Sequence, residues 1–285
     1  MNGANNKKIG LIIPDWTNPF FSSIAHSFQN ECVEHKYSII AVDSYNSRAR
    51  ELNNIELLTS MDIDGLIFIT VGENGRAYEK LDEFKKPLLV LDREIPLDNV
   101  DYLMNNNKLG IEIGLDYLYN LNHRKIAFIA GPQDTVPGKE RYDFFCRKMS
   151  DLGIEKNDAL VYPGDFMFGS GNEAVNQFLQ IAEGERPTAI FASNDIMAFG
   201  VIQGLHEKGY KIPDDFSILG FDDVQFSSWI YPKLSTIKQD VKGIAKKGVE
   251  LLSNRIANPN PITDSKIEII NPQLIKRNSC KKIGL

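Results

Sequence analysis

Ile9-Gly-Leu-Ile-Ile13 and the helical segment that follows it, from Asn18 to Glu34, indicate the fold class. A short apolar run without polar alternation is typical of a parallel strand that is buried on both faces. A helix that follows such a strand is the usual continuation of a βαβ unit. These first elements therefore predict an α/β protein.

The same alternation continues along the chain. Strands are expected at residues 37–42, 65–69 and 87–91, and helices at 48–60 and 78–84. The pattern then restarts. Helices are expected at 106–121, 139–151 and 195–208, and a further helix follows a loop at 164–171 and ends at residue 180. Strands are expected at 125–130, near Leu160, and at 189–192 and 217–221. A helix at 241–254 and short strands near Ile267 and Leu274 complete the chain. The restart predicts two successive α/β halves.

Composition and charge argue against several classes of protein. The 285 residues are 42% hydrophobic, which suffices for an ordinary core, and their formal net charge is −6. The chain alone therefore offers no surface built to neutralise nucleic-acid phosphates. The apolar runs are far shorter than the roughly 20 residues of a membrane-spanning helix. Residues 1–8 lack the apolar region of a secretory signal, which predicts a cytoplasmic protein.

The cysteines and histidines give no sign of a metal site or a thiol-based active site. Cys32, Cys146 and Cys280 are far apart in the chain, and the four histidines are scattered, without metal-ligand spacing. We therefore expect reduced structural thiols and no metal or other cofactor.

Polar and aromatic residues gather directly after the predicted strands. They occupy residues 15–21, Asp92-Arg93, Asn194-Asp195 and Asp222-Asp223. Ligands of open α/β sheets bind outside the carboxyl ends of the strands. Carboxylates, guanidinium groups and amides can bind hydroxyls, and flat rings can cover C–H faces. This set is typical of a site for a polyol.

Eight motifs stand in order along nearly the whole chain. They are Ile9-Gly-Leu-Ile-Ile-Pro-Asp15, Asn18-Pro-Phe-Phe21, Asp64-Gly-Leu-Ile67, Pro87-Leu-Leu-Val-Leu-Asp-Arg93, His123-Arg-Lys-Ile-Ala-Phe-Ile-Ala-Gly131, Ala189-Ile-Phe-Ala-Ser-Asn-Asp-Ile-Met-Ala-Phe-Gly200, Ile218-Leu-Gly-Phe-Asp-Asp223 and Leu234-Ser-Thr-Ile-Lys-Gln-Asp240. The ordered series resembles the effector domain of the Lac/Gal repressor family and its periplasmic sugar-binding relatives.

The resemblance implies a type I periplasmic-binding-protein-like fold. It would contain two Rossmann-like subdomains with parallel sheets, joined by three crossovers near residues 103–106, 237–239 and 265–267, with the effector between the subdomains. The expected N-terminal subdomain is 8–104 plus about 239–265, and the C-terminal subdomain is 105–237 plus about 267–285. Residues 1–7 would be a residual linker. The family's helix-turn-helix headpiece is expected to be absent, so this chain should not bind an operator alone.

The resemblance also implies effector contacts in both subdomains. The first subdomain would contribute Asn18, Phe20, Phe21, Asp92 and Arg93. The second would contribute Arg141 as the effector-binding arginine and Phe166 as the aromatic platform, and a polar clamp would consist of Asn194, Asp222 and Gln239. One departure is Tyr142-Asp-Phe-Phe145, where the family usually has a glycine before an aromatic residue. This departure predicts a slightly different placement of the arginine's helix.

Several of these residues also have purely structural interpretations. Asn18 could cap a helix whose first turn carries two core aromatics. Asp92 and Arg93 could form a surface ion pair at a strand end. Asn194 could cap the next helix.

The second subdomain leaves further alternatives open. Arg141 lies among charged neighbours and could belong to a solvated helix face. Phe168 competes with Phe166 as the platform. Asp222 and Asp223 could cap a turn, although two carboxylates after an apolar strand carry a desolvation cost unless a donor such as Arg141 or a sugar hydroxyl reaches them.

We therefore hypothesise that the chain is the effector-binding and dimerisation domain of a bacterial transcription regulator, and that this regulator is a repressor. A ribose-like pentose is the first choice of effector, with a hexose or a purine behind it. The expected partners are this effector and a second copy of the chain in a homodimer, with operator DNA reached only through a headpiece. Closure around the effector would change operator affinity only if the closed state binds it better.

Two rival functions remain at this point. A periplasmic sugar-binding protein of a transporter shares the fold and the pocket, but the missing signal sequence and the tail from Leu274 to Ser279 favour the repressor branch. An enzyme is the second rival. Pro14-Asp-Trp-Thr17 stands where a dinucleotide-binding glycine motif would follow the first strand, and no Walker-type lysine loop is present. We therefore expect no catalytic activity.

Overall fold

The computed structural model describes residues 7–98, 100–155, 157–258 and 265–284, and the chain divides into two compact units. The first unit comprises Met1–Asn105 and Asp240–Ile270, and the second comprises Asn106–Gln239 and Asn271–Leu285. The chain thus passes between the units at three points. The expected linker at residues 1–7 lies outside the described residues except for Lys7.

The third passage comes later in the chain than residues 265–267. Strand β11 (Ile267–Ile270) pairs in parallel with β5 (Asp101–Asn105), so that Ile267 lies opposite Tyr102 and Ile270 lies opposite Asn105. Because this pairing makes β11 an edge strand of the first unit's sheet, the chain leaves that unit only after Ile270.

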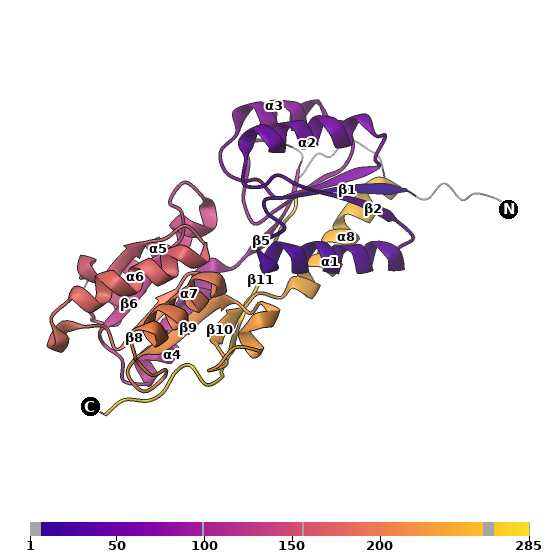
Figure 1. Ribbon diagram of the computed structural model, residues 1–285. Coiled ribbons are helices and arrows are strands. Elements are labelled where there is room, and N and C mark those ends of the chain that lie inside the picture. The colour runs from indigo at the N-terminus through magenta and orange to yellow at the C-terminus, as the bar shows by residue number, and fades with distance from the viewer. Residues whose placement is uncertain (1–6, 99, 156, 259–264, 285) are drawn as a thin grey trace. The chain divides into compact units, whose positions relative to one another are not determined.

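The described part of the first unit is built on a six-stranded parallel sheet in the order β11-β5-β4-β3-β1-β2. The other strands are β1 (Lys8–Ile13), β2 (Ser38–Asp43), β3 (Gly65–Phe68) and β4 (Leu88–Leu91). Helices α2 (Arg48–Ser60) and α3 (Gly75–Glu83) cover one face, and α1 (Pro19–Glu34) and α8 (Val241–Ala257) cover the other (Figure 1).

Apolar side chains on both faces of this sheet form its core. Ile12, Phe68 and Val90 are fully buried and pack with Ile55 and Leu81 of the helices above them. A strand covered on both faces needs apolar residues at successive positions, which explains the uninterrupted runs in the sequence. The predicted α/β class is therefore confirmed in this unit.

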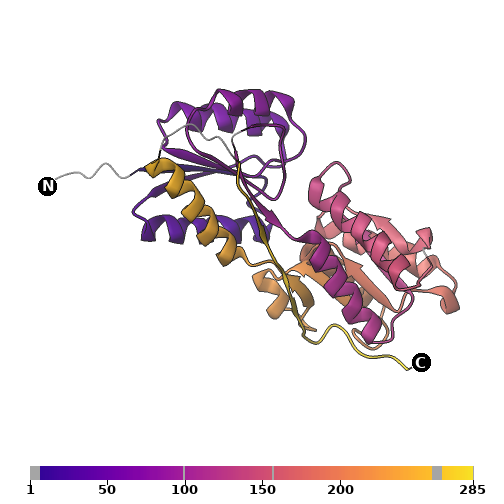
Figure 2. The ribbon, with the colours of Figure 1, turned by 180° about the vertical axis from the view of Figure 1, so that it is seen from behind.

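The second unit repeats the plan with a six-stranded sheet among its described residues, in the order β12-β10-β9-β8-β6-β7. Its strands are β6 (Ile126–Ala130), β7 (Val161–Pro163), β8 (Ala189–Ala192), β9 (Ser217–Asp222), β10 (Ser235–Lys238) and β12 (Gln273–Ile275). Only the β10–β12 pair among them is antiparallel. Helices α4 (Asn107–Asn120) and α5 (Val136–Asp151) lie side by side on one face (Figure 2), and α6 (Phe168–Gln180) and α7 (Asp195–Glu207) cover the other.

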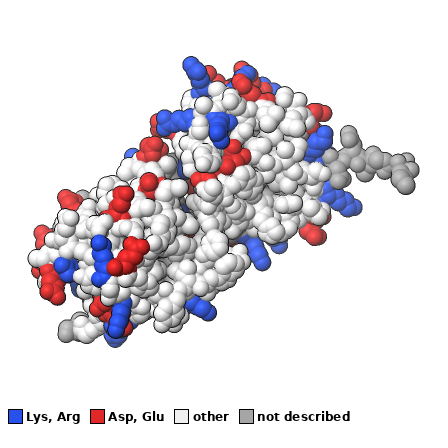
Figure 3. Space-filling view, viewed as in Figure 1, with Lys and Arg blue, Asp and Glu red and all other residues white. Residues whose placement is uncertain are grey.

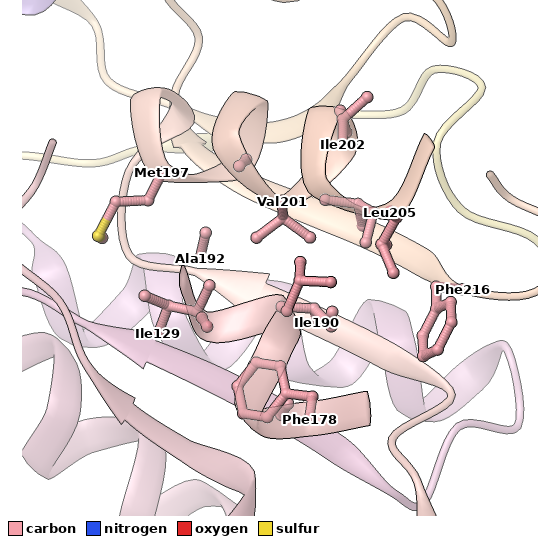
Figure 4. Close-up of a cluster of buried hydrophobic side chains, with 14 of the residues drawn as sticks. Ile129, Phe178, Ile190, Ala192, Met197, Val201, Ile202, Leu205 and Phe216 are labelled. Carbon is pink, nitrogen blue, oxygen red and sulfur yellow. The ribbon is translucent and has the colours of Figure 1, made fainter. Parts of the chain in front are cut away.

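Strand β8 shows how alternate residues supply two cores. Ile190 and Ala192 face α6 and α7, where they pack with Val201 and Phe178 (Figure 4), whereas Phe191 packs on the α4 and α5 side. Helices α6 and α7 approach each other closely, because a Cβ at Gly171 would collide with the backbone carbonyl of Met197. This close packing places the N-terminus of α7 firmly at the carboxyl end of β8.

A buried histidine fastens the C-terminal tail to the second unit. His123 Nδ1 lies 2.8 Å from Thr188 Oγ1, and His123 Nε2 lies 3.1 Å from the carbonyl oxygen of Lys281. Because a carbonyl oxygen only accepts, Nε2 carries the proton. Burial lowers the pKa of His123 from 6.5, and the charge of Arg124 acts in the same direction.

The lowered pKa of His123 predicts a loss of stability in mild acid. The unfolded chain binds the proton more readily than the folded chain, so the stabilisation is complete above pH 6.5 and is lost as the pH falls through the lower folded pKa. Chemical denaturation of the natural chain and of a His123→Gln variant should show stability curves that converge as the pH falls. Parallel curves would exclude this role for His123.

Charged and apolar surfaces add two observations. On the face shown in Figure 3, acidic and basic side chains are interspersed rather than separated by sign. Among the described residues, no helix combines the length and the apolar character required to cross a bilayer.

Candidate functional site

All five predicted residues of the second unit lie near the carboxyl end of its sheet. Direct contacts connect them in two groups that share Arg141: one group contains Asp222 and Gln239, and the other contains Phe166 and Asn194. The structure therefore brings together an arginine, a carboxylate, two amides and an aromatic ring.

Arg141 is the centre of this cluster. It is only 4% exposed, so it does not lie on a solvated helix face. Its Nε donates to Asn107 Oδ1 at 2.9 Å, and its Nη1 donates to the carbonyl oxygen of Ser193 at 2.6 Å. The guanidinium carbon lies 3.8 Å from the centre of the Phe221 ring, a favourable cation–π position. These three contacts fix the plane of the guanidinium.

Asp222 and Gln239 form the polar side of the cluster. Asp222 Oδ1 lies 3.7 Å from Arg141 Nη1 and accepts a hydrogen bond from Gln239 Nε2 at 2.6 Å. Arg141 thus supplies the opposite charge, and Gln239 the hydrogen-bond donor, that a buried carboxylate requires. Gln239 Oε1 is also buried, and no hydrogen-bond donor among the described residues reaches it. The pair leaves an acceptor available for a hydroxyl group.

Asn194 and Phe166 form the other side. Asn194 caps α7 by accepting from Met197 N at 2.9 Å, so the predicted capping role is confirmed, and its Nδ2 donates to the carbonyl oxygen of Phe166 at 2.9 Å. The Phe166 ring occupies the space that a side chain at Gly131 would need. Its centre lies 5.9 Å from the guanidinium carbon of Arg141. Phe168, the competing aromatic, begins α6 and is 39% exposed.

In the first unit, one group of predicted residues follows β1. Asn18 caps α1 by accepting a hydrogen bond from Phe20 N at 3.0 Å, and Pro19 is the first helical residue. Phe20 is buried and Phe21 is half-buried, with their ring centres 5.4 Å apart. The structural interpretation of this segment, a capped helix start with a core aromatic, is therefore correct for Asn18 and Phe20.

The second group follows β4, at the same end of the parallel sheet but two strands away from β1. Asp92 and Arg93 are each 6% exposed, which rules out a surface ion pair. Asp92 accepts from Asn105 Nδ2 at 2.9 Å. Burial raises the pKa of Glu51, while hydrogen bonds and the charge of Arg93 act in the opposite direction. A buried carboxylate thus lies within the field of Arg93.

Three residues at these sites were not predicted from the sequence. Asn107 orients Arg141 and also donates to Glu140 Oε2 at 2.9 Å, and Ser193 supplies a carbonyl acceptor. Glu51, fully buried in α2, accepts from Val71 N at 2.6 Å. The run Asn105-Asn106-Asn107 at the start of a predicted helix was a usable signal for Asn107. Glu51 gave none, because a glutamate in a polar helical stretch is usually solvated.

The chemistry of these residues suits binding rather than turnover. Charged donors, carboxylate acceptors and amides can engage several hydroxyls of one polyol, and an aromatic ring can cover its C–H face. The described residues contain no group of three or more His, Cys, Asp or Glu side chains that could hold a metal ion.

Comparison with known proteins identifies relatives over almost the full chain. Residues 115–280 match the periplasmic binding protein-like domain family. The HTH-type transcriptional repressor PurR of Mannheimia succiniciproducens is 31% identical over 281 residues, which cover 98% of this chain and 82% of that repressor. The ribose operon repressor of Escherichia coli K12 is 29% identical over 272 residues, covering 95% of this chain and 81% of that repressor.

A solved structure gives the same result. A LacI family transcriptional regulator of Enterococcus faecium, determined with bound ribose, superposes with a TM-score of 0.85 at 26% identity and covers 98% of this chain and 100% of its own. The relatives named here are transcriptional repressors and a regulator, not enzymes. The chain therefore belongs to the LacI family of transcriptional regulators, whose effector-binding, periplasmic-binding-protein-like domain it contains.

Proposed function

We propose that this domain binds ribose or a closely related pentose, and that the bound sugar sets the operator affinity of a bacterial repressor. The observation that carries the proposal is the cluster of Arg141, Asp222 and Gln239, in which a buried ion pair stands beside the buried acceptor Gln239 Oε1. Adjacent sugar hydroxyls both donate and accept, so they match a guanidinium, a carboxylate and an amide placed together.

The relatives support this choice of ligand. One is a ribose operon repressor, and another was solved with ribose bound. A purine is the alternative ligand. Phe166 could stack on either a sugar face or a purine ring, but the two carboxylates Asp92 and Asp222 favour a ligand that donates several hydroxyl hydrogens.

We extend the proposal to ten contact residues. Asn18, Phe20, Phe21, Asp92 and Arg93 of the first unit would act with Arg141, Phe166, Asn194, Asp222 and Gln239 of the second on the same sugar. A ligand that engages residues of both units shifts their equilibrium only by its differential affinity for the two arrangements. This is how a small sugar would change the DNA affinity of a regulator.

Isothermal titration calorimetry with ribose tests the proposed ligand. We expect saturable binding of ribose, with one sugar per chain and weaker or absent heats for hexoses and purines. Saturable binding of a purine without ribose binding would replace the sugar with the alternative ligand. The absence of heat with ribose would refute the proposed effector.

We propose that the domain also forms a homodimer. Phe226, Trp229 and Tyr231 expose 44%, 63% and 88% of their surface within one short segment of the second unit. An exposed aromatic patch of this kind is typical of a protein interface. Analytical ultracentrifugation should show a dimer for the natural chain and a monomer for a Trp229→Ser/Tyr231→Ser variant. A monomeric natural chain would refute the dimer.

The remaining parts of the proposal concern the cellular compartment of the regulator and its contact with operator DNA. We place the regulator in the cytoplasm, where operator DNA is accessible, with DNA contact made through a helix-turn-helix headpiece. The repressor relatives favour this function over the periplasmic transport alternative. An electrophoretic mobility assay with this chain alone should show no operator complex, because its formal charge is −6.

A further inference from the structure

The second unit contains one short segment that begins in the ligand cluster and ends on the surface. Asp222 is the last residue of β9, and the 3-10 helix η3 (Gln225–Ser228) begins three residues later. The exposed aromatic residues Phe226, Trp229 and Tyr231 lie within and just after η3. The part from Asp222 to Tyr231 is called the aromatic segment below.

The backbone at the start of the aromatic segment is strained. Asp222 has φ +116° and Asp223 has φ +58°, so two consecutive residues with side chains adopt positive φ values. Such conformations persist only when surrounding contacts hold them. Gln239 Nε2 holds Asp222, and Arg277 Nη2 donates to Asp223 Oδ1 at 2.6 Å. The third contact comes from a residue outside the predicted ligand set.

That residue is Asp195, the first residue of α7. Its side chain is fully buried. Asp195 Oδ2 accepts from Val224 N at 2.9 Å and from Ser227 Oγ at 2.6 Å, while Oδ1 accepts from Thr236 Oγ1 at 2.5 Å. Two of these three donors belong to the aromatic segment, and Thr236 belongs to β10. Asp195 therefore attaches the aromatic segment to the helix that Asn194 caps.

Asp195 also responds to the charge in the ligand cluster. Burial raises the pKa of Asp195 to about 8, and the negative charge of Asp222 acts in the same direction, whereas the three donors act against it. A ligand donor that offsets the charge on Asp222 would relieve this repulsion. Because hydrogen bonds to an ionised carboxylate are stronger than those to a neutral one, the bonds from Val224 and Ser227 would strengthen.

We propose that Asp195 is a positioning residue that transmits ligand binding at Asp222 to the aromatic segment through its hydrogen bonds to Val224 and Ser227. The proposal rests on the proposed sugar-binding function. It predicts that the surroundings of Trp229 change when the sugar binds, although the proposed contact residues do not include Trp229. The exposed aromatic surface would thus report the state of the ligand site within the second unit itself.

Fluorine NMR provides a direct test. The chain has two tryptophans, Trp16 and Trp229, so labelling with 5-fluorotryptophan gives two resonances that a Trp16→Phe variant assigns. Saturating ribose should shift the Trp229 resonance in the otherwise natural chain. In a Ser227→Ala variant this shift should be lost, while calorimetry still detects ribose binding.

Thr236→Val is the matched control. It removes the other hydroxyl donor to the same carboxylate from an equally buried position, but Thr236 lies outside the aromatic segment. The ribose-induced shift of Trp229 should therefore persist. Loss of the shift in both variants would assign Asp195 a purely structural role and overturn the proposal.

Two further outcomes separate the proposal from the function on which it rests. Ribose binding by calorimetry without a shift of Trp229 in the natural chain would overturn the coupling and leave the proposed function intact. No ribose binding by calorimetry would refute the proposed function, and the coupling would fall with it because it requires that ligand at Asp222.

Discussion

Replacing Arg141 with alanine is expected to weaken ribose binding at least about thirtyfold, because truncating one partner of a buried charge pair costs roughly 2 kcal/mol or more. The substitution removes the guanidinium that lies 3.7 Å from Asp222 Oδ1, so that Arg141 no longer compensates the negative charge of this buried carboxylate. It also removes the guanidinium that would clamp the sugar hydroxyls. Calorimetry with ribose measures the loss, and thermal unfolding shows whether the variant remains folded.

Two further variants define what the arginine does. Arg141→Lys keeps the charge but loses the planar fork, so an intermediate affinity is expected. Arg147→Ala removes an exposed arginine from the same helix, where its guanidinium carbon lies 5.6 Å from the centre of the Phe144 ring, and ribose affinity should not change. Equal affinities of the Arg141→Ala variant and the natural chain would contradict the assignment of this residue.

The strands were the most predictable part of the fold. Strand β8 has the predicted bounds, and β1 and β9 differ from the predicted ones by a single residue each. Residues 9–13, 189–192 and 218–221 of these strands are buried on both faces, and they carry only apolar side chains or are glycine. Strand β5 was not predicted as a strand, because its first residue, Asp101, is a carboxylate. Its burial depends on Arg255, which lies far along the chain.

Three helices began earlier than the sequence pattern indicated. Helix α3 starts at Gly75 rather than residue 78. Helix α5 starts at Val136 rather than residue 139, because Thr135 caps it by accepting from Gly138 N. Helix α6 starts at Phe168, inside the stretch expected to be a loop. The glycine at 171 suggested a loop, yet it permits the close approach of α6 to Met197 of α7. A tertiary contact thus outweighed a local propensity.

The sequence indicated candidate residues but not the network of contacts that joins some of them. The predicted Arg141, Asp222 and Gln239 are joined by direct contacts in the second unit. Their positioning partners, Asn107 and Asp195, are polar residues near helix starts, where a capping role is the usual expectation. Only the folded structure shows that Asn107 instead holds the arginine and that Asp195 holds the aromatic segment.

Replacing Asp101 with alanine is expected to lower the free energy of unfolding by roughly 3–5 kcal/mol, because it leaves a cation without its buried partner. Asp101 receives two parallel hydrogen bonds from Arg255, at 2.9 Å from Nε and 2.8 Å from Nη2, and a third from Lys266 N at 3.0 Å. These bonds join α8 and the start of β11 to β5. Chemical denaturation measures the loss of stability in the first unit.

The effect should depend on the burial of Asp101 rather than on charge pairing as such. Asp62 pairs with Lys86 at 2.6 Å, but the Asp62 side chain is 93% exposed, so Asp62→Ala should cause no measurable change in stability. Asp101→Asn retains one acceptor oxygen for Arg255 and should lie between the natural chain and the alanine variant. Because β5 and β11 both lead to crossings between the units, the alanine variant should also bind ribose more weakly when the first unit begins to unfold. A loss of stability no greater than that of Asp62→Ala would show that the three hydrogen bonds to Asp101 do not hold these strands together.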